Sequence, residues 1–111
     1  MTLRVFLSHT AEMFEGYYGA RALAALAEHA EVIRNPSTGV LSGDALAEAA
    51  RGCHAIVADR ATPGLPETFT AMPELLAFLR VAVDISTINV PAASAAGVLV
   101  TRATPGFVDA V

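Results

Sequence analysis

Short apolar runs alternate with Ala/Leu-rich stretches along most of the chain. The apolar runs predict strands at residues 4–8, 31–34, 55–59, 78–83 and 98–101. The last three runs contain almost no polar residue, which is typical of strands buried on both faces of a parallel sheet. Helices are predicted within residues 17–30, 42–52, 66–72 and 89–97. Pro66 suits a first helical turn and Asn89 suits a helix cap, which supports the last two.

This alternation of strand and helix predicts an α/β fold. With right-handed crossovers, the chain would form an open parallel sheet of five strands with helices on both faces. A flavodoxin-like strand order, 2-1-3-4-5, is the simplest arrangement. We expect residues 1–103 to form this single domain. In such sheets the carboxyl ends of the strands share one edge, where ligands bind.

Composition narrows the range of partners. Only 16% of the residues are charged and 54% are hydrophobic, so part of the surface is expected to contact another domain or subunit. The net charge of −4, without a basic cluster, argues against nucleic acid. No apolar run reaches the roughly 20 residues of a membrane span. The N-terminus resembles a strand rather than a signal peptide, so we expect a cytoplasmic protein that does not bind membranes.

Two kinds of site are excluded by the residues that they would need. The three His and one Cys show no metal-ligand spacing, so no metal is expected. Asp59 is followed by Pro63, as in response-regulator receiver domains. However, such domains also need two acidic residues after the first strand and a Lys after the fifth. Here Ser8, His9 and Thr10 follow the first strand, and the chain has no Lys. His9 is in a position to face the ligand crevice.

The pentapeptide RATPG occurs twice, at residues 60–64 and 102–106, each time after a predicted strand. The Thr-Pro-Gly part is explained by the need for a turn. The arginines are more informative, because a guanidinium at the carboxyl edge suits a carboxylate or a phosphate. Two interpretations of Arg60 remain open. It either binds an anionic ligand or only pairs with Asp59 or Asp84 at the surface.

The segment LLAFLRVAVDISTINVPAASAAGVLVTRATPGFVDAV, residues 75–111, resembles one protein family. It is similar to the end of the N-terminal domain of D-isomer-specific 2-hydroxyacid dehydrogenases, of which phosphoglycerate dehydrogenase is a member. The matching residues are Arg80, Ile88, Ala92, Ala93, Gly97, Val98, Val100, Pro105, Gly106, Ala110 and Val111. Residues 35–64 resemble the preceding helix and third strand of the family more loosely.

The resemblance implies a flavodoxin-like, substrate-side domain of a larger enzyme. In the family, a second domain binds NAD through a Rossmann unit and supplies the catalytic Arg, Glu and His. We therefore expect no catalytic or cofactor-binding residue in this chain, and no activity from the chain alone. Residues 104–111 would begin the crossing into the missing NAD-binding domain. A C-terminal helix that returns to pack on the first domain would also be missing, and the parent would be a homodimer.

The resemblance also places the substrate, a small anionic 2-hydroxy or 2-keto acid, at two loops. The implied substrate-binding residues are Arg60, Ala61, Val81, Ala82, Val83 and Asp84. The last four correspond to a Gly-x-Gly loop whose backbone N–H groups hold the substrate carboxylate, but Ala82 and Asp84 replace both glycines. An Asp beside a carboxylate site is unfavourable, so a phosphoglycerate-, hydroxypyruvate- or glyoxylate-like acid is left open. The second pentapeptide is assigned to the interdomain hinge.

A second function remains open beside the dehydrogenase. The chain would then be a stand-alone flavodoxin-like module that regulates or binds without catalysing a reaction.

Overall fold

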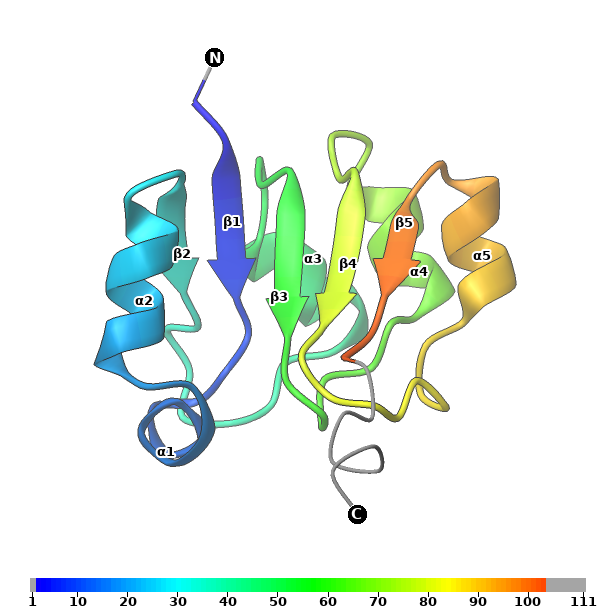
Figure 1. Ribbon diagram of the computed structural model, residues 1–111. Helices are drawn as coiled ribbons and strands as arrows, with labels where there is room; N and C mark the ends of the chain where they lie inside the picture. The colour runs from blue at the N-terminus through cyan, green and yellow to red at the C-terminus, as the bar shows by residue number, and fades with distance from the viewer. Residues whose placement is uncertain (1, 104–111) are drawn as a thin grey trace.

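The computed structural model describes residues 2–103. Its centre is a five-stranded, all-parallel sheet with the order β2-β1-β3-β4-β5 (Figure 1). The strands are β1 (Arg4–Leu7), β2 (Glu31–Arg34), β3 (Ala55–Ala58), β4 (Ala77–Arg80) and β5 (Leu99–Thr101). The predicted fold class and strand order are confirmed.

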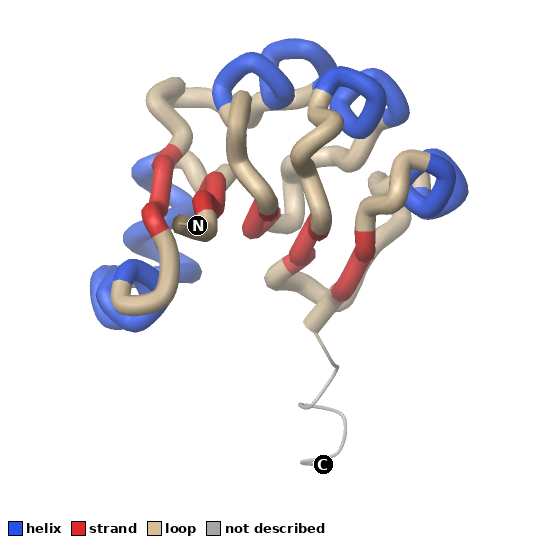
Figure 2. The backbone as a smooth tube through the Cα atoms, turned by 90° about the horizontal axis from the view of Figure 1, so that it is seen from above, coloured by secondary structure: helices blue, strands red, loops and turns tan. Residues whose placement is uncertain are grey.

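The helices lie on both faces of the sheet. They are α1 (Ala11–Met13), the π-helical turn η1 (Phe14–Tyr18), α2 (Ala20–Ala27), α3 (Gly43–Ala49), α4 (Pro66–Ala71) and α5 (Val90–Ala95). Figure 2 shows α3, α4 and α5 on one side of the sheet and α2 on the other, at the β1–β2 end. One face is therefore covered more fully than the other.

Alternation along each strand builds two separate cores. Phe6, Ile56 and Phe78 are fully buried and pack toward the face that carries α3, α4 and α5. There the ring of Phe69 meets Phe78 edge-on, with 5.8 Å between ring centroids. The alternate strand positions, such as Leu7, pack on the opposite face with residues from η1 and α2. Burial on both faces explains why these strands have nearly continuous apolar sequences.

The helix predicted within residues 17–30 is wrong at its start. Gly19 has φ of 88°, a left-handed conformation that interrupts the helix and separates η1 from α2. The sequence pattern also missed α1, which begins where Thr10 Oγ1 accepts a hydrogen bond from the Met13 amide at 3.2 Å. The first connection is therefore a chain of short helical turns before α2.

The strand predicted at 78–83 ends earlier, at Arg80. After Arg80 the chain turns, because Asp84 Oδ1 accepts from the Ser86 amide at 2.8 Å and Arg80 Nη1 donates to the Asp84 carbonyl at 3.1 Å. Val81, Ala82 and Val83 therefore belong to a loop. The other strands differ from their predicted bounds by no more than one residue.

Two further findings concern the part of the chain that the structure describes. No helix within it is long and apolar enough to cross a membrane. No group of three or more His, Cys, Asp and Glu in residues 2–103 is arranged to hold a metal ion. The predicted crossing segment, residues 104–111, and the Thr-Pro-Gly of the second pentapeptide lie outside the described residues.

Candidate active-site edge

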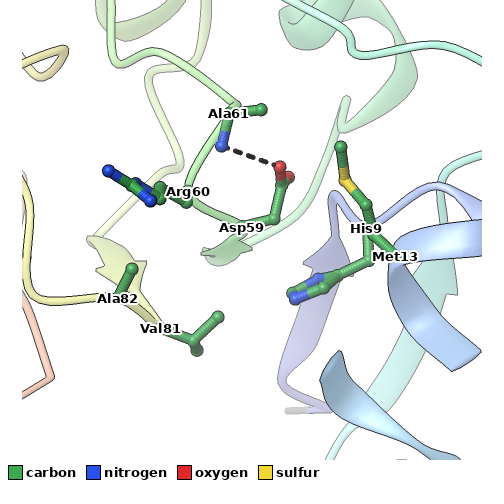
Figure 3. Close-up of a pocket in the computed structure, with 7 residues that line it drawn as sticks. All are labelled: His9, Met13, Asp59, Arg60, Ala61, Val81 and Ala82. Atoms are coloured by element: carbon green, nitrogen blue, oxygen red, sulfur yellow. Dashed lines mark hydrogen bonds between the residues drawn. The ribbon is translucent and has the colours of Figure 1, made fainter. Parts of the chain in front are cut away.

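A hollow of about 310 Å³ opens at the carboxyl edge of the sheet. Its lining residues, drawn in Figure 3, are His9, Met13, Asp59, Arg60, Ala61, Val81 and Ala82. An adjoining, more open groove of about 610 Å³ is lined by Arg60, Ala82, Val83, Asp84, Ile85, Ser86 and Arg102. The structure thus brings all six sequence-predicted residues to one edge, and Arg60 and Ala82 border both hollows.

Asp59 is a buried carboxylate that holds the loop after β3 in shape. Its Oδ1 accepts from the hydroxyls of Ser8 and Thr62, and its Oδ2 accepts from the Ala61 amide at 3.0 Å. The Ser8 hydroxyl also accepts from the Asp59 amide at 3.0 Å. Burial favours the neutral acid, but these hydrogen bonds and nearby His9 outweigh it, so the pKa of Asp59 lies below its usual value. Asp59 is therefore engaged in structure.

Arg60 lies next to this carboxylate without pairing with it. Its side chain is exposed, and in residues 2–103 no ion pair joins Arg60 to Asp59 or Asp84. Figure 3 shows Arg60 and His9 on opposite sides of Asp59. The surface ion pair considered from the sequence is therefore absent from the described structure, and the guanidinium remains accessible to a ligand.

Arg80 links the loop after β3 to the loop after β4 through hydrogen bonds. Arg80 is 2% exposed, and its Nη1 donates to the carbonyls of Arg60 and Asp84, both at 3.1 Å. Its Nη2 donates to the Thr62 carbonyl, and both terminal nitrogens contact Thr87 Oγ1 at 3.4 and 3.3 Å. Sequence reasoning matched Arg80 to the family but assigned it no role. The available signal was an Arg that ends an otherwise apolar strand.

His9 faces the hollow from the end of β1, as its position in the sequence suggested. It is 2% exposed. Burial lowers the pKa of His9, the Asp59 carboxylate opposes this shift, and Arg34 adds to it. The net direction favours a neutral imidazole, so His9 adds no fixed positive charge to the hollow.

The loop after β4 presents backbone donors to the same edge. The Val81 amide donates to the Ala58 carbonyl at 3.0 Å, and the Ala82 carbonyl accepts from the Ala103 amide at 3.1 Å. Within residues 2–103, no hydrogen bond is donated by the amides of Ala82, Val83 and Asp84. They are therefore available to an acceptor from outside.

The Asp84 carboxylate accepts hydrogen bonds from Ser86 in its own loop. Hydrogen bonds from the Ser86 amide and hydroxyl lower the pKa of Asp84, and the charges of Arg60 and Arg80 lower it further. Asp84 is therefore an anion beside the groove. Its negative charge partly offsets the positive charge of the arginines.

The edge does not fit a nicotinamide dinucleotide. With this strand order, a pyrophosphate would lie at the loop after β1, where glycines normally allow its close approach. That loop instead carries Ser8, His9 and Thr10, all buried, and the Asp59 carboxylate beside them. A carboxylate would repel the pyrophosphate.

The family model of the D-isomer specific 2-hydroxyacid dehydrogenase catalytic domain matches residues 11–111. The chain belongs to this family. A search of curated proteins found no match.

Several solved structures share the fold of this chain. The PH0520 protein of Pyrococcus horikoshii OT3 is 19% identical, with a TM-score of 0.78 over 99% of this chain and 30% of its own. The apo D-lactate dehydrogenase of Escherichia coli is 14% identical, with a TM-score of 0.72 over 91% and 31%. An NAD-complexed family member from Lactobacillus delbrueckii ssp. bulgaricus is 17% identical, with a TM-score of 0.64 over 91% and 29%. The chain thus spans about a third of these proteins.

Proposed function

We propose that this chain is the substrate-side domain of an NAD-dependent D-2-hydroxyacid dehydrogenase. The observation that carries the proposal is Arg60, an exposed guanidinium without an acidic partner in residues 2–103, on the border of both hollows. Beside it lie the loop amides of Ala82, Val83 and Asp84, which have no acceptor among the described residues. A planar fork and a row of N–H donors together suit the carboxylate of a 2-hydroxy or 2-keto acid.

In this proposal each part of the edge has a separate task. Arg60 orients the substrate by binding its carboxylate, and the loop amides donate hydrogen bonds to the same carboxylate. Asp59 and Arg80 hold the two loops in register without touching the substrate. The small side chain of Ala82 borders both hollows and leaves room for the ligand there. None of these groups is placed to transfer a hydride, so we assign this chain binding and orientation rather than chemistry.

The remaining parts of the reaction belong to the parent enzyme in this proposal. A second domain would bind NAD and supply the groups that move the proton. The parent would act as a cytoplasmic homodimer on a small anionic 2-hydroxy or 2-keto acid. The fold match to dehydrogenases about three times as long supports a parent with further domains.

Arg60→Ala tests the proposal in two forms of the protein. In the ¹⁵N-labelled 111-residue chain, pyruvate should shift the amide resonances of residues 82–84 saturably, and Arg60→Ala should remove most of the shift. In a parent that carries the second domain, kcat/KM should fall roughly ten- to a hundredfold, because a charge-assisted contact contributes about 1.5–3 kcal/mol.

Arg21→Ala is the matched control, because Arg21 is an exposed arginine on α2, outside both hollows. It should behave as the wild type. If kcat/KM of Arg60→Ala stays within about twofold and the loop resonances do not respond to any 2-keto acid, the chain does not bind substrate at this edge. A binding module without catalysis would then be the better interpretation.

A further inference from the structure

The repeated pentapeptide places its two arginines on one groove. Arg60 begins the first copy and Arg102 begins the second, and both line the open groove of about 610 Å³. The backbone stretch of residues 82–86 lines the same groove. The assignment of the second pentapeptide to a hinge does not account for this arrangement.

The backbone that carries each arginine is held by hydrogen bonds. Arg102 lies between Thr101, which pairs with Leu79 in the β4–β5 register, and Ala103, whose amide donates to the Ala82 carbonyl at 3.1 Å. The Arg60 carbonyl accepts from Arg80 Nη1 at 3.1 Å. The two guanidiniums are therefore carried by fixed main chain, although both side chains are exposed.

The charges on this groove are not cancelled by internal pairing. Neither Arg60 nor Arg102 forms an ion pair with an acid in residues 2–103. The acidic side chain on the groove is Asp84, and it accepts a hydrogen bond from the Ser86 amide at 2.8 Å. Two cations and one engaged carboxylate leave the groove with a formal charge of +1.

We propose that this groove is a subsite for a second carboxylate, so that the substrate is a 2-keto or 2-hydroxy dicarboxylic acid. The inference rests on the proposed function, in which Arg60 and the loop amides hold the first carboxylate. Arg102 then holds the distal one. A planar guanidinium matches a carboxylate with two parallel hydrogen bonds. A guanidinium also binds phosphate in this way, so the test below includes a phosphorylated acid as the competing ligand.

The hollow on the other side of Arg60 is less suited to the distal carboxylate. It is lined by Met13, Val81 and Ala82, by the buried Asp59 carboxylate and by His9, whose pKa is lowered. Apart from Arg60, the one basic side chain that lines this hollow is His9, and burial favours its neutral form. A dicarboxylate would therefore extend from Arg60 toward Arg102.

The test compares three acids on the 111-residue chain by NMR titration: 2-oxobutyrate with one carboxylate, 2-oxoglutarate with two, and 3-phosphoglycerate with a phosphate. We expect 2-oxoglutarate to bind roughly two- to fivefold more tightly than 2-oxobutyrate, the range for an exposed ion pair. Arg102→Gln should reduce the ratio to about one and leave 2-oxobutyrate unchanged. Arg60→Gln should weaken both acids, and Arg21→Gln, the exposed control on α2, should change neither.

The outcomes separate this inference from the function on which it rests. Equal binding of 2-oxobutyrate and 2-oxoglutarate, unaffected by Arg102→Gln, would overturn the second subsite and leave the carboxylate site at Arg60 in place. Tighter binding of 3-phosphoglycerate than of 2-oxoglutarate, lost in Arg102→Gln, would overturn the dicarboxylate and identify a phosphate subsite. If none of the three acids shifts a resonance of residues 82–84, both the inference and the proposed function are wrong.

Discussion

At the scale of single residues, the edge depends on two buried polar groups that do not touch the proposed ligand. Asp59 holds the loop after β3 through Ser8, Thr62 and the Ala61 amide. Arg80 binds the same loop to the one after β4 through backbone carbonyls. Buried polar groups of this kind are strongly stabilising only while every partner is present, because an unmatched group keeps the cost of leaving water.

Arg80→Lys should therefore lower the free energy of unfolding by about 1.5–3 kcal/mol. A lysine ammonium lacks the planar fork that reaches the Thr62 carbonyl on one side and the Asp84 carbonyl on the other. Urea denaturation measures the loss, and amide resonances of residues 84–87 should shift more than those of α2. A variant as stable as the wild type would show that the guanidinium does not connect the loops.

His9 predicts a pH dependence of stability. Its pKa in the folded protein lies below the usual value, mainly because of burial, so the unfolded chain binds a proton more readily. Stability should fall as the pH drops below about 6.5, by at most about 1.4 kcal/mol per pH unit for one proton. Asp59 also loses its contribution on acidification, but only below its unfolded pKa near 4.

The measurement is the free energy of unfolding at pH 7 and pH 5 for the wild type, His9→Gln and His29→Gln. His29→Gln, an exposed control, should show the wild-type difference between the two pH values, whereas His9→Gln should show a smaller one. An equal pH dependence in all three proteins would mean that the imidazole of His9 is protonated as easily as in the unfolded chain.

At the scale of elements, the first pentapeptide is more than a turn. Gly64 pairs with Ile88 in an isolated parallel bridge, which joins the loop after β3 to the segment before α5. A Cβ atom on Gly64 would lie 2.9 Å from Ile88 Cγ2 and 3.1 Å from Phe69 Cζ. Position 64 therefore needs a glycine because there is no room for a side chain. Backbone conformation is not the reason, because Gly64 is not among the glycines with a positive φ in residues 2–103.

Gly64→Ala should therefore destabilise the domain by about 1–3 kcal/mol, the usual cost of overpacking. Gly39→Ala is the matched control, because within residues 2–103 the one heavy atom less than 4 Å from its added Cβ is Ser37 Oγ, at 3.9 Å. That variant should stay within about 0.5 kcal/mol of the wild type in thermal or urea unfolding. Equal stability of both variants would show that Ile88 moves aside without cost.

The sequence was sufficient for the five strands and their order, because burial on both faces leaves a continuous apolar signal in β3 and β4. It was insufficient for their ends. β4 stops at Arg80, whose side chain binds the Arg60 carbonyl, 20 residues away in the chain. The position of Arg60 at the carboxyl edge could be predicted, because it directly follows an apolar strand. The roles of Thr62 and Arg80 could not, because they depend on contacts between separate loops, and such contacts leave no periodic pattern in the sequence.

At the scale of the whole molecule, the sheet is covered unequally. Figure 2 shows helices along one face, whereas on the other face α2 lies over the β1–β2 end only. On this second face Leu99 of β5 lies beside Ala77 of β4 in the strand register and is 63% exposed. Leu79 of β4, on the same face, is partly buried against the second core. Leu99, Ala77 and Leu79 thus form a small apolar strip on the uncovered face, which is a candidate surface for another domain or subunit.

Leu99→Gln tests whether this strip belongs to the interior of the domain or to an interface. In the 111-residue chain the substitution should change the free energy of unfolding by no more than about 0.5 kcal/mol, because Leu99 has little packing to lose. Leu79→Gln, the matched change at the neighbouring partly buried position, should cost about 1–3 kcal/mol, because it places an amide against the core.

In a parent with further domains, Leu99→Gln should also become destabilising, since the face would then be covered. A loss above 1 kcal/mol for Leu99→Gln in the short chain would mean that this side chain is packed within the domain itself, and the open face would then not be an interface.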